Sequence, residues 1–85
     1  MERKRDPVEL RREFYELPDE AYVDRDTAAA AALLRRESME SYAMKGGGPP
    51  YTRIGRRALY LKRDVLDWIA KRGRRVENTA QLQAG

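Results

Sequence analysis

Arginine is concentrated around one glycine in the middle of the chain, where Arg53, Arg56 and Arg57 flank Gly55. Residues 51–54 and 58–61, on either side, are rich in the aromatic and branched side chains that strands favour. Gly55-Arg56 is a Gly-X pair, which is typical of the two-residue turn of a β-hairpin. We therefore expect an exposed hairpin whose guanidinium groups bind the phosphates of a polyanion.

The net charge of +4 conceals a strong asymmetry along the chain. Residues 1–34 carry 6 basic and 9 acidic side chains, whereas residues 35–75 carry 12 basic and 4 acidic ones. Such a concentration of positive charge is typical of a surface that binds nucleic acid. Arginine that merely keeps a small domain soluble would give a similar balance, so charge alone does not decide between the two interpretations.

The chain contains neither cysteine nor histidine. Disulfides and thiolate metal sites are therefore excluded, and the commonest general base and metal ligand is missing. The triple glycine at 46–48 is followed by prolines rather than by a lysine and a helix, so it is not a phosphate-binding loop. The acidic residues at the expected helix starts are explained as caps. We expect no catalytic residue, no metal and no cofactor, and hence not an enzyme.

No apolar run approaches the roughly 20 residues that a membrane-spanning helix needs. The longest run, 28–34, is mostly alanine, and the charged residues 1–6 lack the apolar stretch of a signal peptide. We expect a cytoplasmic protein, bacterial or phage-encoded, without a membrane partner.

The first expected helix begins after Asp6, which is suited to cap it, with Pro7 in the first turn. Leu10, Phe14 and Leu17 then form an apolar stripe at helical spacing, and the following proline ends the helix. This stripe would either pack on the rest of the domain or bind a protein partner.

A second helix of about ten residues is expected to run from its cap at Asp24 through Leu34. Further helices are expected over 36–45 and 63–72, each followed by glycine. Gly46 is expected to take the left-handed conformation after the first of these. The polar segment 74–85 shows no periodicity, and we expect it to be disordered.

Helix, turn, helix, hairpin and helix follow one another in the order of a winged helix-turn-helix domain. A particular set of residues extends this pattern: Val23, Asp26, Ala28, Ala29, Ala32, Leu34, Met39, Tyr42, the run Gly46 to Tyr51, Ile54 to Arg57, Tyr60, Asp64 and Trp68. With these residues the chain resembles the small helix-turn-helix domains of excisionase and AlpA-type regulators, relatives of the MerR DNA-binding domain. The resemblance covers about half of the chain, and 48–60 is its most specific part.

The resemblance implies a mainly α fold with a small β-hairpin, a winged helix-turn-helix of the MerR and excisionase kind over 19–73. Residues 1–18 would then form a charged tail and an extra helix, and 74–85 a basic-to-polar tail. The chain departs from the family in the turn between the two helices, where Leu33 and Arg35 replace a glycine and a capping serine. Without the cap, the start of helix 36–45 should lose on the order of 1 kcal/mol. Arg63 likewise replaces the serine that usually caps the last helix.

In such a fold, helix 36–45 lies in the major groove of DNA, where base edges can be read. Arg36 is the first candidate for a base contact, because its guanidinium can hold guanine O6 and N7 together. Glu40 and Ser41 are candidates for a base or a phosphate, and Glu40 could accept from cytosine N4. Glu37 is also a candidate, although Glu37 and Glu40 could equally serve in ion pairs along the helix.

The remaining contacts would supply affinity rather than sequence preference. We expect Arg35, Lys45 and Thr52 to bind phosphates. The hairpin arginines Arg53, Arg56 and Arg57 should straddle the backbone or enter the minor groove. Tyr60 and Trp68 are expected to pack in the core.

The resemblance implies an excisionase, or recombination directionality factor. Such a protein binds repeated sites on double-stranded DNA together with other copies of itself, bends the DNA, and biases a tyrosine or serine integrase towards excision. A small transcriptional regulator of mobile-element or phage genes would use the same surface. A non-DNA adaptor that binds protein through the apolar stripe of the first helix is the alternative from another class.

Overall fold

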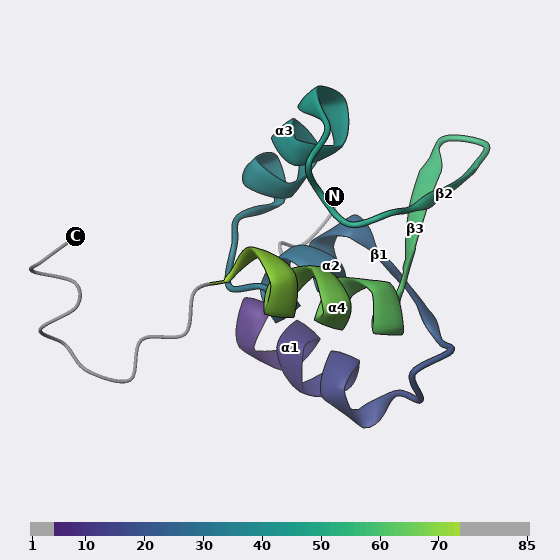
Figure 1. Cartoon of the computed structure of the whole chain (residues 1–85). Coiled ribbons are helices and arrows are strands. Elements are labelled where there is room, and N and C mark those ends of the chain that lie inside the picture. The colour runs from purple at the N-terminus through teal and green to yellow at the C-terminus, as the bar shows by residue number, and fades with distance from the viewer. Residues whose placement is uncertain (1–4, 74–85) are drawn as a thin grey trace, which may run out of the picture.

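The computed structural model describes residues 5–73. Its elements, shown in Figure 1, are α1 (Pro7–Glu16), β1 (Tyr22–Asp24), α2 (Arg25–Ala31), α3 (Arg36–Lys45), β2 (Thr52–Ile54), β3 (Arg57–Leu61) and α4 (Lys62–Arg72). The fold is mainly helical, with one three-stranded antiparallel sheet in the order β1-β3-β2. No helix in this part of the chain is both long and apolar enough to cross a membrane. The disorder expected of 74–85 lies outside the described residues.

The first helix forms as the sequence predicts. The carboxylate of Asp6 accepts a hydrogen bond from the Val8 N–H at 3.0 Å, and Pro7 stands in the first turn. Leu10 and Phe14 are buried, and Leu17 packs against the same core. The apolar stripe of α1 is therefore covered by the domain itself.

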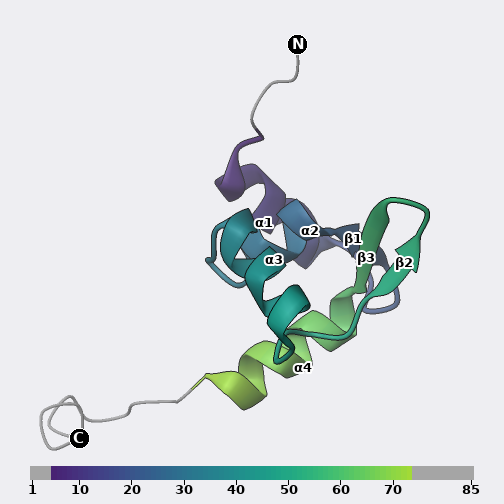
Figure 2. The same cartoon turned by 90° about the horizontal axis from the view of Figure 1, so that it is seen from above.

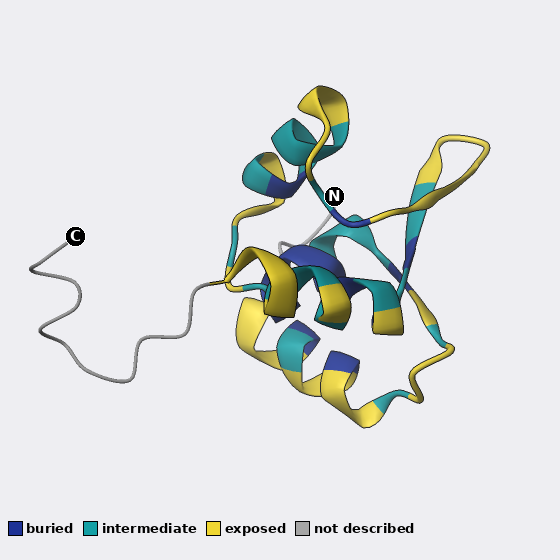
Figure 3. Cartoon of the chain, viewed as in Figure 1, coloured by how far each residue is buried: buried dark blue, intermediate teal, exposed yellow. Residues whose placement is uncertain are grey.

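Alanines form the centre of the core. Ala28, Ala29, Ala30 and Ala31 of α2 are each at most 5% exposed. Their small side chains allow neighbouring helices to approach closely, and α1 and α3 lie on opposite sides of α2 (Figures 1 and 3). Larger side chains complete the core around them: Phe14, Val23, Met39, Tyr60 and Val65.

The second helix is shorter than predicted, because the chain turns after Ala31. The Leu34 N–H donates to the Ala29 oxygen at 2.8 Å, and the Leu33 N–H donates to the Ala30 oxygen at 3.0 Å. These two bonds form a Schellman motif, in which the residue after the cap takes a positive φ. Leu33 does so, with φ of 60°.

A third strand was not predicted. β1 pairs with β3, with Val23 opposite Tyr60, while β2 pairs with the other edge of β3, with Arg53 opposite Ala58. The predicted hairpin is confirmed, with Gly55 in its turn at φ of 61°. β1 has only three residues, too few to show an alternating pattern, and its partner lies far along the chain.

Candidate nucleic-acid interface

The ten predicted contact residues all lie on α3, directly before it or on the β2–β3 hairpin. Arg35 stands at the N-cap position of α3, where its side chain makes no capping hydrogen bond. Arg36, Glu37, Glu40, Ser41 and Lys45 lie on α3; Thr52 and Arg53 lie on β2, Arg56 in the turn and Arg57 at the start of β3. α3 and the hairpin project from the same side of the molecule, away from α1 (Figure 1). The basic side chains among the ten are exposed, and the tip of the hairpin is exposed throughout (Figure 3).

Five of the ten line a single open groove between α3 and the hairpin: Arg36, Glu40, Arg53, Arg56 and Arg57. The N-terminal turn of α2 closes the groove with Asp24, Arg25 and Asp26. Arg35 and Glu37 lie elsewhere, in a second hollow that faces the start of α1. Ser41, Lys45 and Thr52 line neither of these two hollows. The groove brings together the residue expected to read bases and the arginines expected to bind phosphates.

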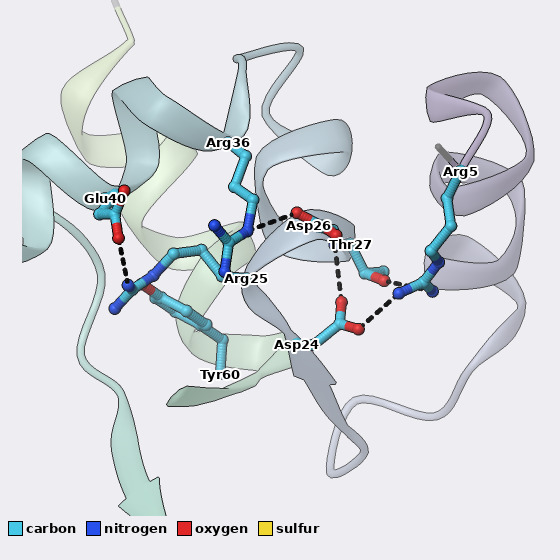
Figure 4. A network of polar contacts seen from close by, with 8 residues as sticks. All are labelled: Arg5, Asp24, Arg25, Asp26, Thr27, Arg36, Glu40 and Tyr60. Atoms are coloured by element: carbon cyan, nitrogen blue, oxygen red, sulfur yellow. Dashed lines mark hydrogen bonds and ion pairs between the residues drawn. The ribbon is translucent and has the colours of Figure 1, made fainter. Parts of the chain in front are cut away.

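Arg36 is held by a neighbour that sequence reasoning assigned only to the helix start. Its Nε lies 2.8 Å from Oδ1 of Asp26, on the first turn of α2 (Figure 4). The predicted alternative placed Glu37 and Glu40 in ion pairs along α3. Glu40 instead lies 3.8 Å from Nη1 of Arg25. Both ion pairs therefore join α2 to α3 rather than stabilising α3 alone.

Arg25 is the main functional candidate that sequence reasoning missed. Its Nε donates to the Tyr60 hydroxyl at 3.0 Å, and its guanidinium lies 5.3 Å from the ring centre of Tyr51. Burial lowers the pKa of Arg25, but the hydrogen bond to Tyr60 and the nearby charges of Tyr60, Tyr51 and Glu40 together outweigh burial, so the net pKa is raised. The side chain is 12% exposed, so it fixes the floor of the groove and offers little surface to a ligand. Nothing in the local sequence Asp-Arg-Asp marks this role.

The glycine-proline segment fixes the position of the hairpin relative to α3. Gly46 has φ of 83° and ψ of 161°, an extended conformation open essentially only to glycine, rather than the predicted left-handed helical one. A Cβ on Gly48 would lie 2.9 Å from that of Tyr42, so the segment passes directly over α3. Trp68 of α4 donates from Nε1 to the Gly47 oxygen at 2.7 Å. Figure 2 shows this connection running across α4 to the hairpin.

Trp68 and Tyr60 serve as packing residues, as predicted. Tyr60 is fully buried, and the partly buried Trp68 meets Tyr42 edge to face with ring centres 5.3 Å apart. Among residues 5–73, no group of three or more carboxylates is placed to hold a metal ion. No protein-family model matches the chain, and a search of curated proteins finds no match.

Proposed function

We propose that this protein binds double-stranded DNA as a winged helix-turn-helix domain. α2, the turn at 32–35 and α3 would be the helix-turn-helix, with α3 in the major groove and the β2–β3 hairpin as the wing. The observation that carries the proposal is the groove between α3 and the hairpin. It sets Arg36 at the start of α3 beside Arg53, Arg56 and Arg57 of the hairpin.

Charge and exposure support a phosphate-binding role for the wing. Arg53, Arg56 and Arg57 are exposed, and no ion pair within the described residues engages them. Unpaired guanidinium groups bind phosphate without first breaking an internal contact. They would supply affinity that does not depend on sequence, while Arg36 would supply preference for guanine.

The alternative of a protein-binding adaptor depends on the apolar stripe of α1, which is buried in this structure. Leu10 and Phe14 are 6% and 0% exposed, and Leu17 packs against the same core. The stripe therefore stabilises the domain and is not free to bind another protein.

Within DNA binding, we propose the excisionase role, with several copies on repeated sites beside an integrase. A small transcriptional regulator would present the same surface, and the arrangement of sites distinguishes the two. Sequencing genomic fragments retained by the protein should return a repeat array near a recombinase gene. A lone promoter operator would instead assign the regulator.

The binding itself is tested by titrating a labelled random-sequence duplex and its single strand. Affinity for the duplex should fall steeply between about 50 and about 200 mM salt, because bound phosphates release counterions. The single strand should bind more weakly, since it has no major groove to hold α3. Equal affinity for the duplex and the single strand, or affinity for the duplex that does not change with salt, would contradict the proposal.

A further inference from the structure

We infer that Asp26 is a positioning residue for sequence preference, which orients Arg36 towards a guanine. The inference rests on the proposed DNA-binding function and deepens it. Asp26 belongs to α2 and need not touch DNA itself. Its effect on sequence preference would pass through the guanidinium of Arg36.

The geometry of the pair carries the inference. Asp26 Oδ1 lies 2.8 Å from Nε of Arg36, and both side chains line the groove between α3 and the hairpin. The Arg36 side chain is 56% exposed and that of Asp26 is 37% exposed, so the pair stands at the surface where a duplex would lie. Figure 4 shows the carboxylate meeting the guanidinium from the side of α2.

The atom that is engaged decides what the arginine can still do. A guanidinium carries N–H donors on Nε and on both Nη atoms. The carboxylate contacts the guanidinium through Nε, which leaves one donor on each Nη atom, on the edge opposite Nε, for another acceptor. Guanine O6 and N7 are acceptors that two such donors can bind together. A side chain held in advance also loses less conformational freedom on binding.

The same carboxylate should weaken binding to phosphate. Asp26 lies at the surface expected to meet a polyanion, and Asp24 and Glu40 line the same groove. Its negative charge repels the DNA backbone, so removing it should strengthen binding to duplexes of any sequence. Asp26 would thus lower affinity in general while raising discrimination. An acidic residue that serves only the dipole of α2 would have no effect on discrimination.

The two effects can be separated with the full-length chain and a random duplex library. Wild type, Asp26→Ala, Asp26→Asn, Arg36→Ala and the double variant Asp26→Ala/Arg36→Ala are each used to select bound sequences. Glu16→Ala removes the same charge from the exposed end of α1 and serves as the matched control. Circular dichroism melts confirm that each variant is folded.

Asp26→Ala should bind non-selected duplex at least as tightly as wild type. It should nevertheless lose the preference for guanine at the same base position at which Arg36→Ala loses it. A bidentate contact discriminates by roughly 5-fold to 150-fold, and the loss should be a measurable part of that range. Asp26→Asn retains a side-chain oxygen that Nε can still contact and should restore part of the preference. The double variant should discriminate no worse than Arg36→Ala, and Glu16→Ala should match wild type.

Unchanged guanine preference in both Asp26 variants, with wild type binding selectively, would overturn this inference alone. The inference would also be overturned if the Asp26 variants bound the selected site and all other duplexes more tightly by the same factor. The ion pair would then lower affinity in general without contributing to the preference for guanine. Absence of salt-sensitive duplex binding by wild type would overturn the proposed function, and this inference with it.

Discussion

The ammonium nitrogen of Lys62 lies 2.6 Å from the main-chain oxygen of Leu17 and 3.2 Å from that of Tyr15. Lys62 begins α4 and is 6% exposed, whereas the two carbonyls stand at the end of α1. Carbonyls at a helix C-terminus lack partners in the helix and carry partial negative charge, and a cation satisfies both needs. One buried side chain therefore joins α1 to the end of the sheet and the start of α4.

Replacing Lys62 with Met should lower the free energy of unfolding by about 1–3 kcal/mol, because the apolar part of the side chain is kept while two partly buried carbonyls lose their donor. Urea unfolding measures the change. Lys71→Met is the matched control, since Lys71 is exposed and, among residues 5–73, its ion pair is with Asp67 one turn away. That variant should lose about 0.5 kcal/mol or less. Similar small losses in both variants would show that Lys62 does not hold α1.

Leu33 offers a stabilising substitution. It has φ of 60° and is 73% exposed, so its side chain gains little by burial while its backbone is strained. Leu33→Asn should raise the free energy of unfolding by up to about 1 kcal/mol, because asparagine tolerates this conformation better. Leu33→Gly should act in the same direction, less strongly, because glycine gives the unfolded chain more freedom. Thermal melts compare them, and a lowered midpoint in both variants would rule out strain at this position.

Asp24 should contribute to stability in a way that depends on pH. Burial would raise its pKa, but hydrogen bonds from Thr27 and the Arg5 guanidinium, together with the positive charge of Arg5, outweigh burial, and the net pKa is lowered. The folded state therefore binds the proton less readily than the unfolded state. The contribution is present above the ordinary aspartate value of about 3.9 and is lost as the pH falls through the lower folded value.

Two substitutions of Asp24 divide its roles. Asp24→Ala removes the cap of α2 and should cost about 1–2 kcal/mol at pH 7. Asp24→Asn keeps a capping oxygen and should cost less, and its deficit relative to wild type should shrink as the pH falls below about 3.9. Urea unfolding at several pH values makes the comparison. A deficit that stays constant down to low pH would exclude a role for the carboxylate charge.

Arg25 and Tyr60 should be energetically coupled. Arg25→Lys keeps the charge but not the planar fork that reaches the Tyr60 hydroxyl, and Tyr60→Phe removes that hydroxyl. Each should lower the free energy of unfolding by about 1 kcal/mol or more. The double variant should lose less stability than the sum of the losses in the two single variants, since both substitutions remove the same contact. Strict additivity would show that the hydrogen bond contributes nothing to stability.

Local signals predicted most of the elements. Asp6 and Pro7 mark the start of α1, and the bounds of α3 match the predicted 36–45. These features depend on residues adjacent in sequence, such as caps, prolines and apolar spacing. β1 and the early end of α2 depend instead on pairing with β3 and on main-chain bonds around Leu33, which leave no periodic signal.

The candidate site was predictable only in part, for a similar reason. The hairpin arginines follow from composition and turn chemistry. The pairing of Arg36 with Asp26, and the position of Arg25 between Tyr60 and Glu40, arise because α2 packs beside α3 and the sheet. Such contacts join residues whose sequence neighbours give no indication of the partner.

The most direct test of the DNA-binding account compares two double variants that remove the same charge. Arg56→Ala/Arg57→Ala removes two positive charges from the hairpin, and Arg11→Ala/Arg12→Ala removes two from α1, on the opposite side of α2. The measurement is the slope of log affinity for a random-sequence duplex against log salt, which is about −0.9 for each phosphate neutralised. We predict that the hairpin variant binds every duplex more weakly with a slope shallower by up to about 2 units, while the α1 variant matches wild type. Equal slopes for wild type and the hairpin variant, or an equal change in both variants, would contradict the assignment of the hairpin as a DNA-binding wing.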